Sequence, residues 1–326
     1  MRDEAGMERA LALAASVRAT AHPNPWVGCV LATPAGERFE GATQPPGGPH
    51  AEAVALAAAG DRARGATAYV TLEPCAHTGR TGPCADALIQ AGVRRVVIGL
   101  EDPDSRVAGA GMERLRQAGV AVEAGVGSAA VADQLAPYLK HRRTGRPWVV
   151  LKLAASLDGR IAAPDGTSRW ITGAAARADG HRLRAESDVV IVGAGTVRRD
   201  DPALTARSAT GPDPRRVVLG AIPPGARVLP AEAAAGDLGA LLDRLGSEGS
   251  VQVLVEGGAH VAHQFHAAGL VDRYVVYLAP ALFGGSDAVP LFEGPGVATA
   301  AELWRGRFVE VRQVGGDVRV ELAGSC

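Results

Sequence analysis

The stretch "PHAEAVALAAAG", residues 49–60, decides how the first half of the chain is interpreted. It places His50 and Glu52 two residues apart at the start of a segment whose alanines favour a helix. Taken alone, a histidine and a carboxylate in a first helical turn are ordinary, because the helix dipole favours acidic groups there. The sequence around this stretch must therefore decide whether His50 is a metal ligand.

A second stretch, "TLEPCAHTGRTGPC" at residues 71–84, supplies further ligands. Cys75 and Cys84 join His50 to give one nitrogen and two sulfur ligands, a set that holds zinc with a fourth position open to water. Both cysteines lie where a helix would begin, and the positive end of a helix dipole stabilises thiolates. A carboxylate beside such a metal can move a proton from water to a leaving amine, so we predict that Glu52 is catalytic.

The composition limits the class of protein. A length of 326 residues predicts about two domains. The formal net charge of −1, without blocks of like charge, disfavours nucleic acid and membrane partners. No apolar run of about 18 residues occurs, and "MRDEAGMERA" lacks the apolar segment of a signal peptide. Four cysteines are too few for a disulfide framework. We expect a cytoplasmic protein that acts on a small molecule.

Hydrophobic periodicity predicts two α/β halves, residues 1–145 and 146–326, because Gly145 and Pro147 end a helical stretch before a new apolar strand. In the first half, the pattern predicts helices over 4–19, from 50, over 84–91 and over 129–143, and strands around 27–41, 67–72 and 94–100. In the second half, it predicts strands near 148–154, 188–193, 216–219, 251–255 and 272–278, and helices near 174–186 and 258–268.

The metal pattern matches that of zinc deaminases, except that eight residues rather than two separate Cys75 from Cys84. Together with "HPNPWVGCV" (22–30) and "DPDSRVAGAG" (102–111), this insertion resembles the deaminase half of the bifunctional riboflavin-biosynthesis deaminase/reductases. The reductase half is matched, in order and spacing, by "LKLAASLDGRIA" (151–162), "SRWIT" (168–172), "SDVVIVGAGTVRRDDPALTAR" (187–207) and "VEGGAHVAHQF" (255–265). The resemblance therefore covers nearly the whole chain.

The resemblance implies a cytidine-deaminase-like α/β/α sandwich followed by a dihydrofolate-reductase-like α/β domain. It implies zinc-dependent hydrolytic deamination of 2,5-diamino-6-ribosylamino-4(3H)-pyrimidinone 5′-phosphate, followed by NADPH-dependent reduction of the ribosyl to a ribityl chain. It also implies a homo-oligomer formed through the reductase domain. In agreement, no Gly-x-Gly-x-x-Gly follows the first strand of the second half, so a Rossmann cofactor site is not supported.

The resemblance also assigns binding residues. In the deaminase half it implies substrate contacts from Asn24 and Arg80. In the reductase half it implies cofactor contacts from Ala154, Trp170, Thr196, Asp200, Gly257 and Gly258, and substrate contacts from Ser168, Arg184, Leu204, Arg207 and Glu256. Paired arginines suit a dianionic phosphate, and two glycines before a helix let the backbone approach one. Taken singly, Arg80, Arg184 and Arg207 could be surface charges and Trp170 a packing residue.

Three departures from the family's usual pattern bear on which substrate the enzyme uses and on how efficiently it reacts. Thr43 replaces a substrate-contacting histidine, Asp104-Ser105 replaces Asn-Pro, and Gly220-Ala221 replaces Asp-Ser near the cofactor. An added carboxylate near a phosphorylated substrate is unfavourable unless it faces away or the substrate differs. The segment before "VQVLVEGG" (251–258) is also short enough for a strand to be missing.

These departures leave alternatives open. One is a related deaminase/reductase of pyrimidine-derived secondary metabolism, and another is an enzyme with one active domain. A third is a non-catalytic protein that zinc stabilises, which Glu52 argues against because a structural zinc has no use for a nearby non-ligating carboxylate.

Overall fold

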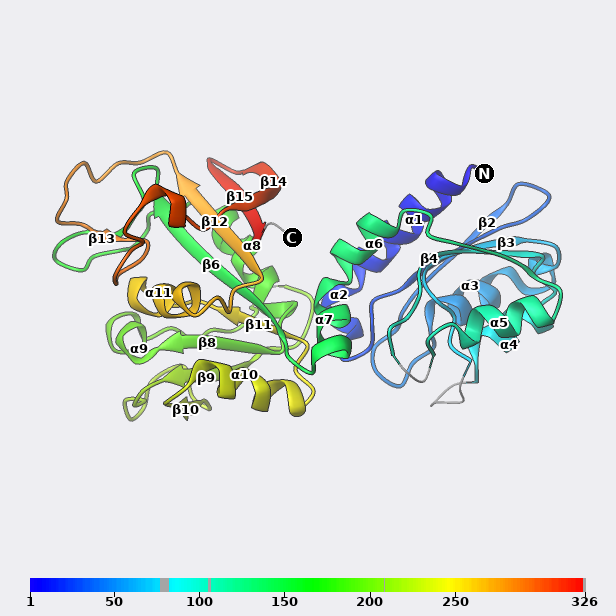
Figure 1. Ribbon diagram of the computed structural model, residues 1–326, viewed down its shortest axis with the longest axis horizontal. Coiled ribbons are helices and arrows are strands. Elements are labelled where there is room, and N and C mark those ends of the chain that lie inside the picture. Colours follow the sequence, from blue (N-terminus) through cyan, green and yellow to red (C-terminus); the bar gives the residue numbers. More distant parts are fainter. Residues whose placement is uncertain (77–81, 105–106, 208, 325–326) are drawn as a thin grey trace. The chain divides into compact units, whose positions relative to one another are not determined.

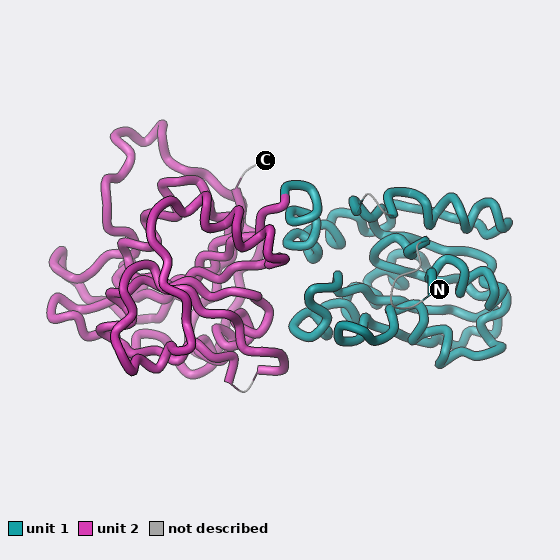
Figure 2. The backbone as a smooth tube through the Cα atoms, turned by 90° about the horizontal axis from the view of Figure 1, so that it is seen from below, with its two compact units in different colours: residues 1–144 teal, residues 145–326 magenta. Residues whose placement is uncertain are grey.

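The computed structural model describes residues 1–76, 82–104, 107–207 and 209–324. The chain divides into two compact units, Met1–Thr144 and Gly145–Cys326 (Figure 2). This division lies one residue before the end that the sequence predicts for the first domain. Arg80 and Ser105 lie outside the described residues, so the prediction for Arg80 has no structural counterpart here.

The first unit is built on a mixed sheet in the order β2-β1-β3-β4-β5. The strand β1 (Gly28–Ala32) is antiparallel to β2 (Arg38–Ala42) and β3 (Thr67–Leu72). The strands β3, β4 (Arg95–Leu100) and β5 (Ala121–Ala124) run parallel. Because parallel strands end at the same edge of a sheet, the residues that follow β3 and β4 are brought together there.

Helices cover both faces of this sheet. On one face lie α1 (Asp3–Ser16) and α6 (Ser128–Gln134), and on the other lie α3 (Ala51–Ala59), α4 (Cys84–Gln90) and α5 (Ala110–Gln117) (Figure 1). The remaining helical segments are α2 (Arg18–Ala21), the 3₁₀ turn Gly60–Ala63 and α7 (Ala136–Thr144). Helix α3 packs closely on β2, because a Cβ at Gly41 would lie 2.1 Å from the Ala51 carbonyl oxygen. This close contact fixes the start of α3, where His50 and Glu52 lie.

The second unit has a larger sheet in the order β10-β9-β8-β11-β6-β12-β15-β14. Its parallel strands are β6 (Trp148–Ser156), β8 (Val189–Gly193), β9 (Arg215–Leu219), β10 (Glu232–Ala234), β11 (Gln252–Val255) and β12 (Arg273–Ala279). The hairpin of β14 (Gly306–Val314) and β15 (Asp317–Gly324) adds antiparallel strands at one edge, and β7 (Arg160–Ala162) pairs separately with β13 (Val289–Pro290). The helical segments are α8 (Ala174–Ala185), α9 (Ala194–Asp200), α10 (Leu238–Ser247), α11 (Ala259–Ala267) and the 3₁₀ turn Ala300–Glu302.

The core of the second unit follows from the alternation of side chains along its strands. Val149 and Leu151 of β6 pack in one cluster with residues of α10 and α11, whereas Val150 packs in the other with residues of α8 and α9. Successive residues of a strand point to opposite faces, so an almost continuous apolar strand serves both clusters. The sheet is thereby held between two layers of helix.

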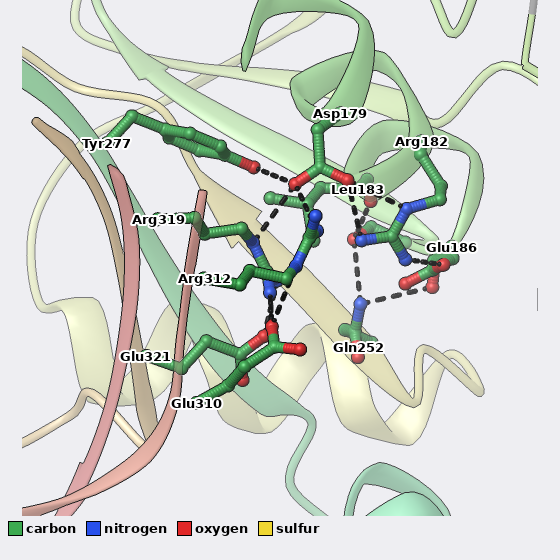
Figure 3. A network of polar contacts seen from close by, with 11 residues as sticks. Asp179, Arg182, Leu183, Glu186, Gln252, Tyr277, Glu310, Arg312, Arg319 and Glu321 are labelled. Atoms are coloured by element: carbon green, nitrogen blue, oxygen red, sulfur yellow. Dashed lines mark hydrogen bonds and ion pairs between the residues drawn. The ribbon is translucent and has the colours of Figure 1, made fainter. Parts of the chain in front are cut away.

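A buried polar network fixes α8 to the antiparallel edge of the sheet. Asp179 accepts a hydrogen bond from the Tyr277 hydroxyl at 2.6 Å, and it pairs with Arg319 at 3.0 Å and with Arg312 at 3.2 Å (Figure 3). The three partners come from β12, β15 and β14. Arg182, on the same helix as Asp179, donates to the other oxygen at 2.8 Å. The network therefore sets the position of the helix that carries Arg184.

Several helices and strands differ from those that the hydrophobic periodicity predicts. The helix predicted over 4–19 ends at Ser16 and is followed by the short α2, and the one predicted over 129–143 is two helices separated at Leu135. The pattern missed α5, β5, α9, α10 and the hairpin of β14 and β15. The helices α5 and α10 are amphipathic, so their periodicity was a signal that could have been used. The strand β5 and the helix α9 are short, with four and seven residues, and show little periodicity. The short segment before β11 forms the three-residue strand β10 and the helix α10.

No helix in the described part of the chain has the length and apolar character needed to span a membrane.

Candidate active sites

Three elements bring the predicted metal ligands together in the first unit. His50 precedes α3, Cys75 follows β3, and Cys84 is the first residue of α4. The Nδ1 atom of His50 lies 3.7 Å from the Cys75 Sγ and 3.3 Å from the Cys84 Sγ, and the three ligand atoms lie within 4.8 Å of one another. A hydrogen bond with Cys84 lowers the pKa of the Cys75 thiol, which favours a thiolate. One nitrogen and two sulfurs at these separations fit a single zinc ion.

Glu52 lies beside this ligand set on the first turn of α3. Its side chain is buried, with 3% exposed, and it lines the same cavity as His50 and Cys75. Burial raises the pKa of Glu52 to about 7, although hydrogen bonding to the backbone opposes this. A carboxyl group with such a pKa can accept and release a proton near neutral pH.

The cavity of the first unit has a volume of about 320 Å³. Asn24, a predicted substrate contact, lines it together with Thr43 and Asp104. The Thr43 hydroxyl donates to the Pro25 carbonyl at 3.1 Å and accepts from the Val27 N–H at 3.0 Å. Because the Thr43 hydroxyl hydrogen-bonds to the backbone, Thr43 forms part of the cavity wall. It does not take the place of the substrate contact that the resemblance assigns to a histidine at this position.

The second unit has a cavity of about 470 Å³ between the ends of its strands and α8 and α9. All the residues that the resemblance assigns to cofactor and substrate in this half line it: Ala154, Ser168, Trp170, Arg184, Thr196, Asp200, Leu204, Arg207, Glu256, Gly257 and Gly258. They come from segments spread over about a hundred residues of sequence. The structure thus brings the predicted residues together, while their individual roles stay predictions.

Arg184 and Glu256 are joined within this cavity. The Nε and Nη2 atoms of Arg184 donate to the two oxygens of Glu256, the second at 3.0 Å, and Nη1 donates to the Thr205 carbonyl at 3.1 Å. The Lys152 ammonium lies 3.7 Å from Glu256. Burial disfavours the charged form of Glu256, but the charges of Arg184 and Lys152 outweigh it and lower its pKa to about 2. Glu256 is therefore a fixed anion, and most donors of Arg184 are engaged.

Trp170 is not buried in the core of this chain. Its side chain is 67% exposed, and it lines the cavity. The Arg177 guanidinium lies over its ring, 4.4 Å from the centroid. The Arg169 guanidinium also lies over the ring, 5.7 Å from its centroid, so two cations contact the indole.

Next to this cavity of the second unit lies another of about 620 Å³. The two cavities share Thr196, Arg199 and Gly258 in their linings. Gly258 precedes α11, whose N-terminus therefore opens onto both cavities. Two joined cavities with a helix N-terminus between them fit an extended, phosphate-bearing dinucleotide. Gly220 lines this neighbouring cavity with a φ of 106°, a conformation that favours glycine.

Sequence reasoning missed some residues of these cavities. Lys152, Arg177 and His181 line the cavity of the second unit, and Tyr138 and Arg142 line that of the first. Lys152 left a signal, since a lone charge within the apolar strand "WVVLKLAAS" requires a partner or a function. Arg142 left none, because the end of a helix is an ordinary place for an arginine.

Fold and sites together define a two-domain enzyme that joins a zinc-binding deaminase region to a reductase domain. Residues 1–100 match the family described as the cytidine and deoxycytidylate deaminase zinc-binding region, and residues 147–320 match the RibD C-terminal domain. The chain belongs to the RibD family, the bifunctional deaminase/reductases of riboflavin biosynthesis, with both domains present.

The relatives match over the full length. The chain is 42% identical to the riboflavin biosynthesis protein RibD of Escherichia coli K12 over 100% of both, and 45% identical to that of Mycobacterium tuberculosis H37Rv over 94% of this chain and 93% of the relative. The structure of Acinetobacter baumannii RibD, form 1, superposes with a TM-score of 0.91 at 38% identity, covering 99% of each chain. A Thermotoga maritima deaminase/reductase gives 0.90 at 33%, also over 99% of each.

These matches confirm the predicted family and α/β fold class. They also confirm the predicted cofactors, zinc for the deaminase domain and NADPH for the reductase domain.

Proposed function

We propose that the first unit removes the ring amine of 2,5-diamino-6-ribosylamino-4(3H)-pyrimidinone 5′-phosphate by hydrolysis, and that the second unit then reduces the ribosyl group of the product to a ribityl chain. The observation that carries the proposal is the placement of Glu52 in one cavity with His50 and Cys75. A buried carboxyl group next to a zinc ligand set serves deamination and has no function in a purely structural metal site.

In the deaminase step, His50, Cys75 and Cys84 would hold zinc, which when bound would supply a Lewis acid that activates water. Glu52 would accept a proton from the attacking water, whose oxygen bonds to the amine-bearing ring carbon, and would deliver it to the amine, which leaves as ammonia as its bond to that carbon breaks. Asn24 lines the cavity, and the family resemblance implies that it contacts the substrate. We keep Arg80 as a proposed phosphate contact on the strength of the family resemblance alone.

In the reductase step, NADPH supplies the hydride when bound. Thr196, Asp200, Gly257 and Gly258 hold the cofactor, with Ala154 and Trp170 beside it. Ser168, Leu204 and Glu256 contact the substrate. Most hydrogen-bond donors of Arg184 are engaged by Glu256 and Thr205, so Arg184 positions Glu256. Arg207 is more exposed and is the better contact for the substrate phosphate.

The proposal includes a cytoplasmic homo-oligomer that associates through the reductase domain and binds neither nucleic acid nor membrane. The edge strand β14 supports this association, because Phe308 and Val311 on it are 70% and 58% exposed. An apolar edge strand readily pairs with another chain. Phe308→Glu is expected to shift the mass measured by light scattering towards the monomer, and an unchanged mass would contradict this interface.

One incubation tests the proposed reactions. Purified, zinc-loaded protein is given the diaminopyrimidinone ribotide and NADPH, and ammonia release and NADPH oxidation are followed together. Ammonia followed by NADPH consumption supports both steps. Ammonia without oxidation would contradict the reductase step and point to the cavity wall at Gly220. The absence of both signals would contradict the proposed substrate.

A further inference from the structure

The cavity of the first unit is strongly acidic. The carboxyl groups of Glu52, Glu73, Asp102 and Asp104 line it. Among the described residues of its lining, Arg142 is the one lysine or arginine. The proposed substrate carries a phosphate, and like charges repel strongly where solvent is partly excluded. A cation of the lining that pairs with one of these carboxylates reduces this repulsion.

Two of these carboxylates are held by donors from the protein itself. Glu73 accepts the backbone N–H groups of Gly109 and Gly111 at 3.0 and 2.9 Å. Asp102 accepts the Tyr138 hydroxyl and the Asp104 N–H, both at 3.0 Å. These contacts give both groups a structural role at the edge where β3 and β4 end.

Asp104 also pairs with a cation at the cavity wall. Its Oδ2 atom lies 3.7 Å from the Arg142 Nε, and the two side chains are 9% and 32% exposed respectively. Arg142 lies on α7, one turn after Tyr138, and its guanidinium lies over the Tyr138 ring, 5.2 Å from the centroid. Tyr138 thus holds Asp102 through its hydroxyl and supports Arg142 through its ring, so that both aspartates are fixed from one helix.

We propose that Arg142 is a positioning residue of the deaminase, which pairs with Asp104 and offsets its negative charge at the cavity wall. The pair allows Asp104 to face the cavity without repelling a phosphorylated substrate. This inference rests on the proposed function and deepens it, because it explains how the same substrate class is compatible with Asp104. The role of Arg142 is expected in substrate binding rather than in proton transfer.

A double-mutant cycle on the full-length, zinc-loaded protein tests the pairing. In the native background, Arg142→Met is expected to raise the KM for the ribotide about tenfold, with kcat changed less than about threefold, because an ion pair with one buried partner is lost. In an Asp104→Asn background, the same substitution is expected to raise KM less than about threefold. Arg142→Lys keeps the charge and is expected to recover most of the lost binding.

Arg143→Met is the matched control, since Arg143 is the next residue of α7 and is exposed but does not line the cavity. It should leave KM unchanged, and all variants should retain zinc and the NADPH-dependent step. An equal rise in KM in both backgrounds, no rise in either, or a loss confined to kcat would overturn the role of Arg142 while leaving the proposed reaction intact. A native protein that releases no ammonia from the ribotide would overturn the proposed function, and the inference with it.

Discussion

Arg184 on α8 and Glu256 at the end of β11 form a two-point ion pair inside the cavity of the second unit. Their side chains are 13% and 10% exposed, so neither charge is well hydrated. A bidentate pair fixes both groups in one plane, which single hydrogen bonds do not achieve. Removing one partner leaves the other as an uncompensated, largely buried charge.

We therefore expect Glu256→Gln to lower kcat/KM of the reductase step at least tenfold, since Arg184 and Lys152 lose the anion that orients them. Deamination, which belongs to the other unit, should stay within twofold. The measurement is NADPH oxidation with the deaminated intermediate as substrate. Glu248→Gln, which alters an exposed pair in the same unit, is the control. Unchanged reduction in Glu256→Gln would exclude Glu256 from the site.

The same pair predicts a pH dependence of stability. The pKa of Glu256 is lowered to about 2 in the folded protein, against roughly 4.3 in an unfolded chain. A depressed carboxyl pKa contributes stability that is complete above the unfolded value and is lost as the pH falls towards the folded value. The difference in Tm between the native protein and Glu256→Gln should hold from pH 7 to about pH 5 and narrow below about pH 4 in calorimetry. A difference that already disappears near pH 6 would contradict the assignment.

The zinc ligands could be predicted from the sequence because their spacing is local and their chemistry is specific. His50 and Glu52 share one helical turn, and Cys75 and Cys84 flank a single loop. The reductase residues could be assigned only through the family resemblance, because Arg184 and Glu256 lie in separate segments that meet through the parallel order of the sheet. No local pattern encodes that meeting.

Arg142 and helix α9 left no signal in the sequence, whereas the C-terminal hairpin did. Arg142 reaches Asp104 because α7 returns to the edge of the sheet, a tertiary contact that leaves no trace in hydrophobic periodicity. Helix α9, "AGTVRRD", begins with a glycine in its first turn and lacks an amphipathic repeat. The C-terminal hairpin did leave a signal, since alternating residues flank Gly315-Gly316, which is a typical turn sequence.

Glu52→Gln separates metal binding from proton transfer. Because Glu52 is not among the clustered ligands, the variant should retain one zinc per chain by mass spectrometric metal analysis. Ammonia release should fall by a factor on the order of 10²–10⁴, the usual contribution of a positioned acid–base group. The NADPH-dependent step provides an internal control for folding. If ammonia release persists in the zinc-loaded variant, Glu52 is not the proton carrier.

Cys75→Ser tests the metal site itself, with Cys29→Ala as its matched control. Cys29 is also buried in the first unit but does not belong to the ligand cluster. We expect Cys75→Ser to lose zinc and ammonia release while keeping NADPH-dependent reduction, and Cys29→Ala to keep zinc. Because a purely structural zinc would unfold the unit on removal, circular dichroism after chelation distinguishes the two cases. Zinc loss in Cys29→Ala, or retained zinc in Cys75→Ser, would contradict the assigned ligand set.

The polar network around Asp179 gives a prediction on stability that is independent of catalysis. Asp179→Asn removes the negative charge with which both Arg319 and Arg312 pair. The side chain of Arg319 is only 4% exposed, and it keeps its ion pair with Glu321. Breaking a buried pair costs several kcal/mol, and the remaining partner reduces this to about 2 kcal/mol. For a unit of this size, the Tm of the second unit should fall by roughly 4–8 °C.

Asp243→Asn is the appropriate comparison, because Asp243 pairs with Arg146 at the surface and should change the Tm very little. Since the network holds α8, which carries Arg184, Asp179→Asn should also raise the KM of the reductase step more than that of deamination. Equal destabilisation by the two substitutions would show that the buried network contributes no more than a surface pair. A stable Asp179→Asn protein with impaired reduction would instead place Asp179 in the reductase site itself.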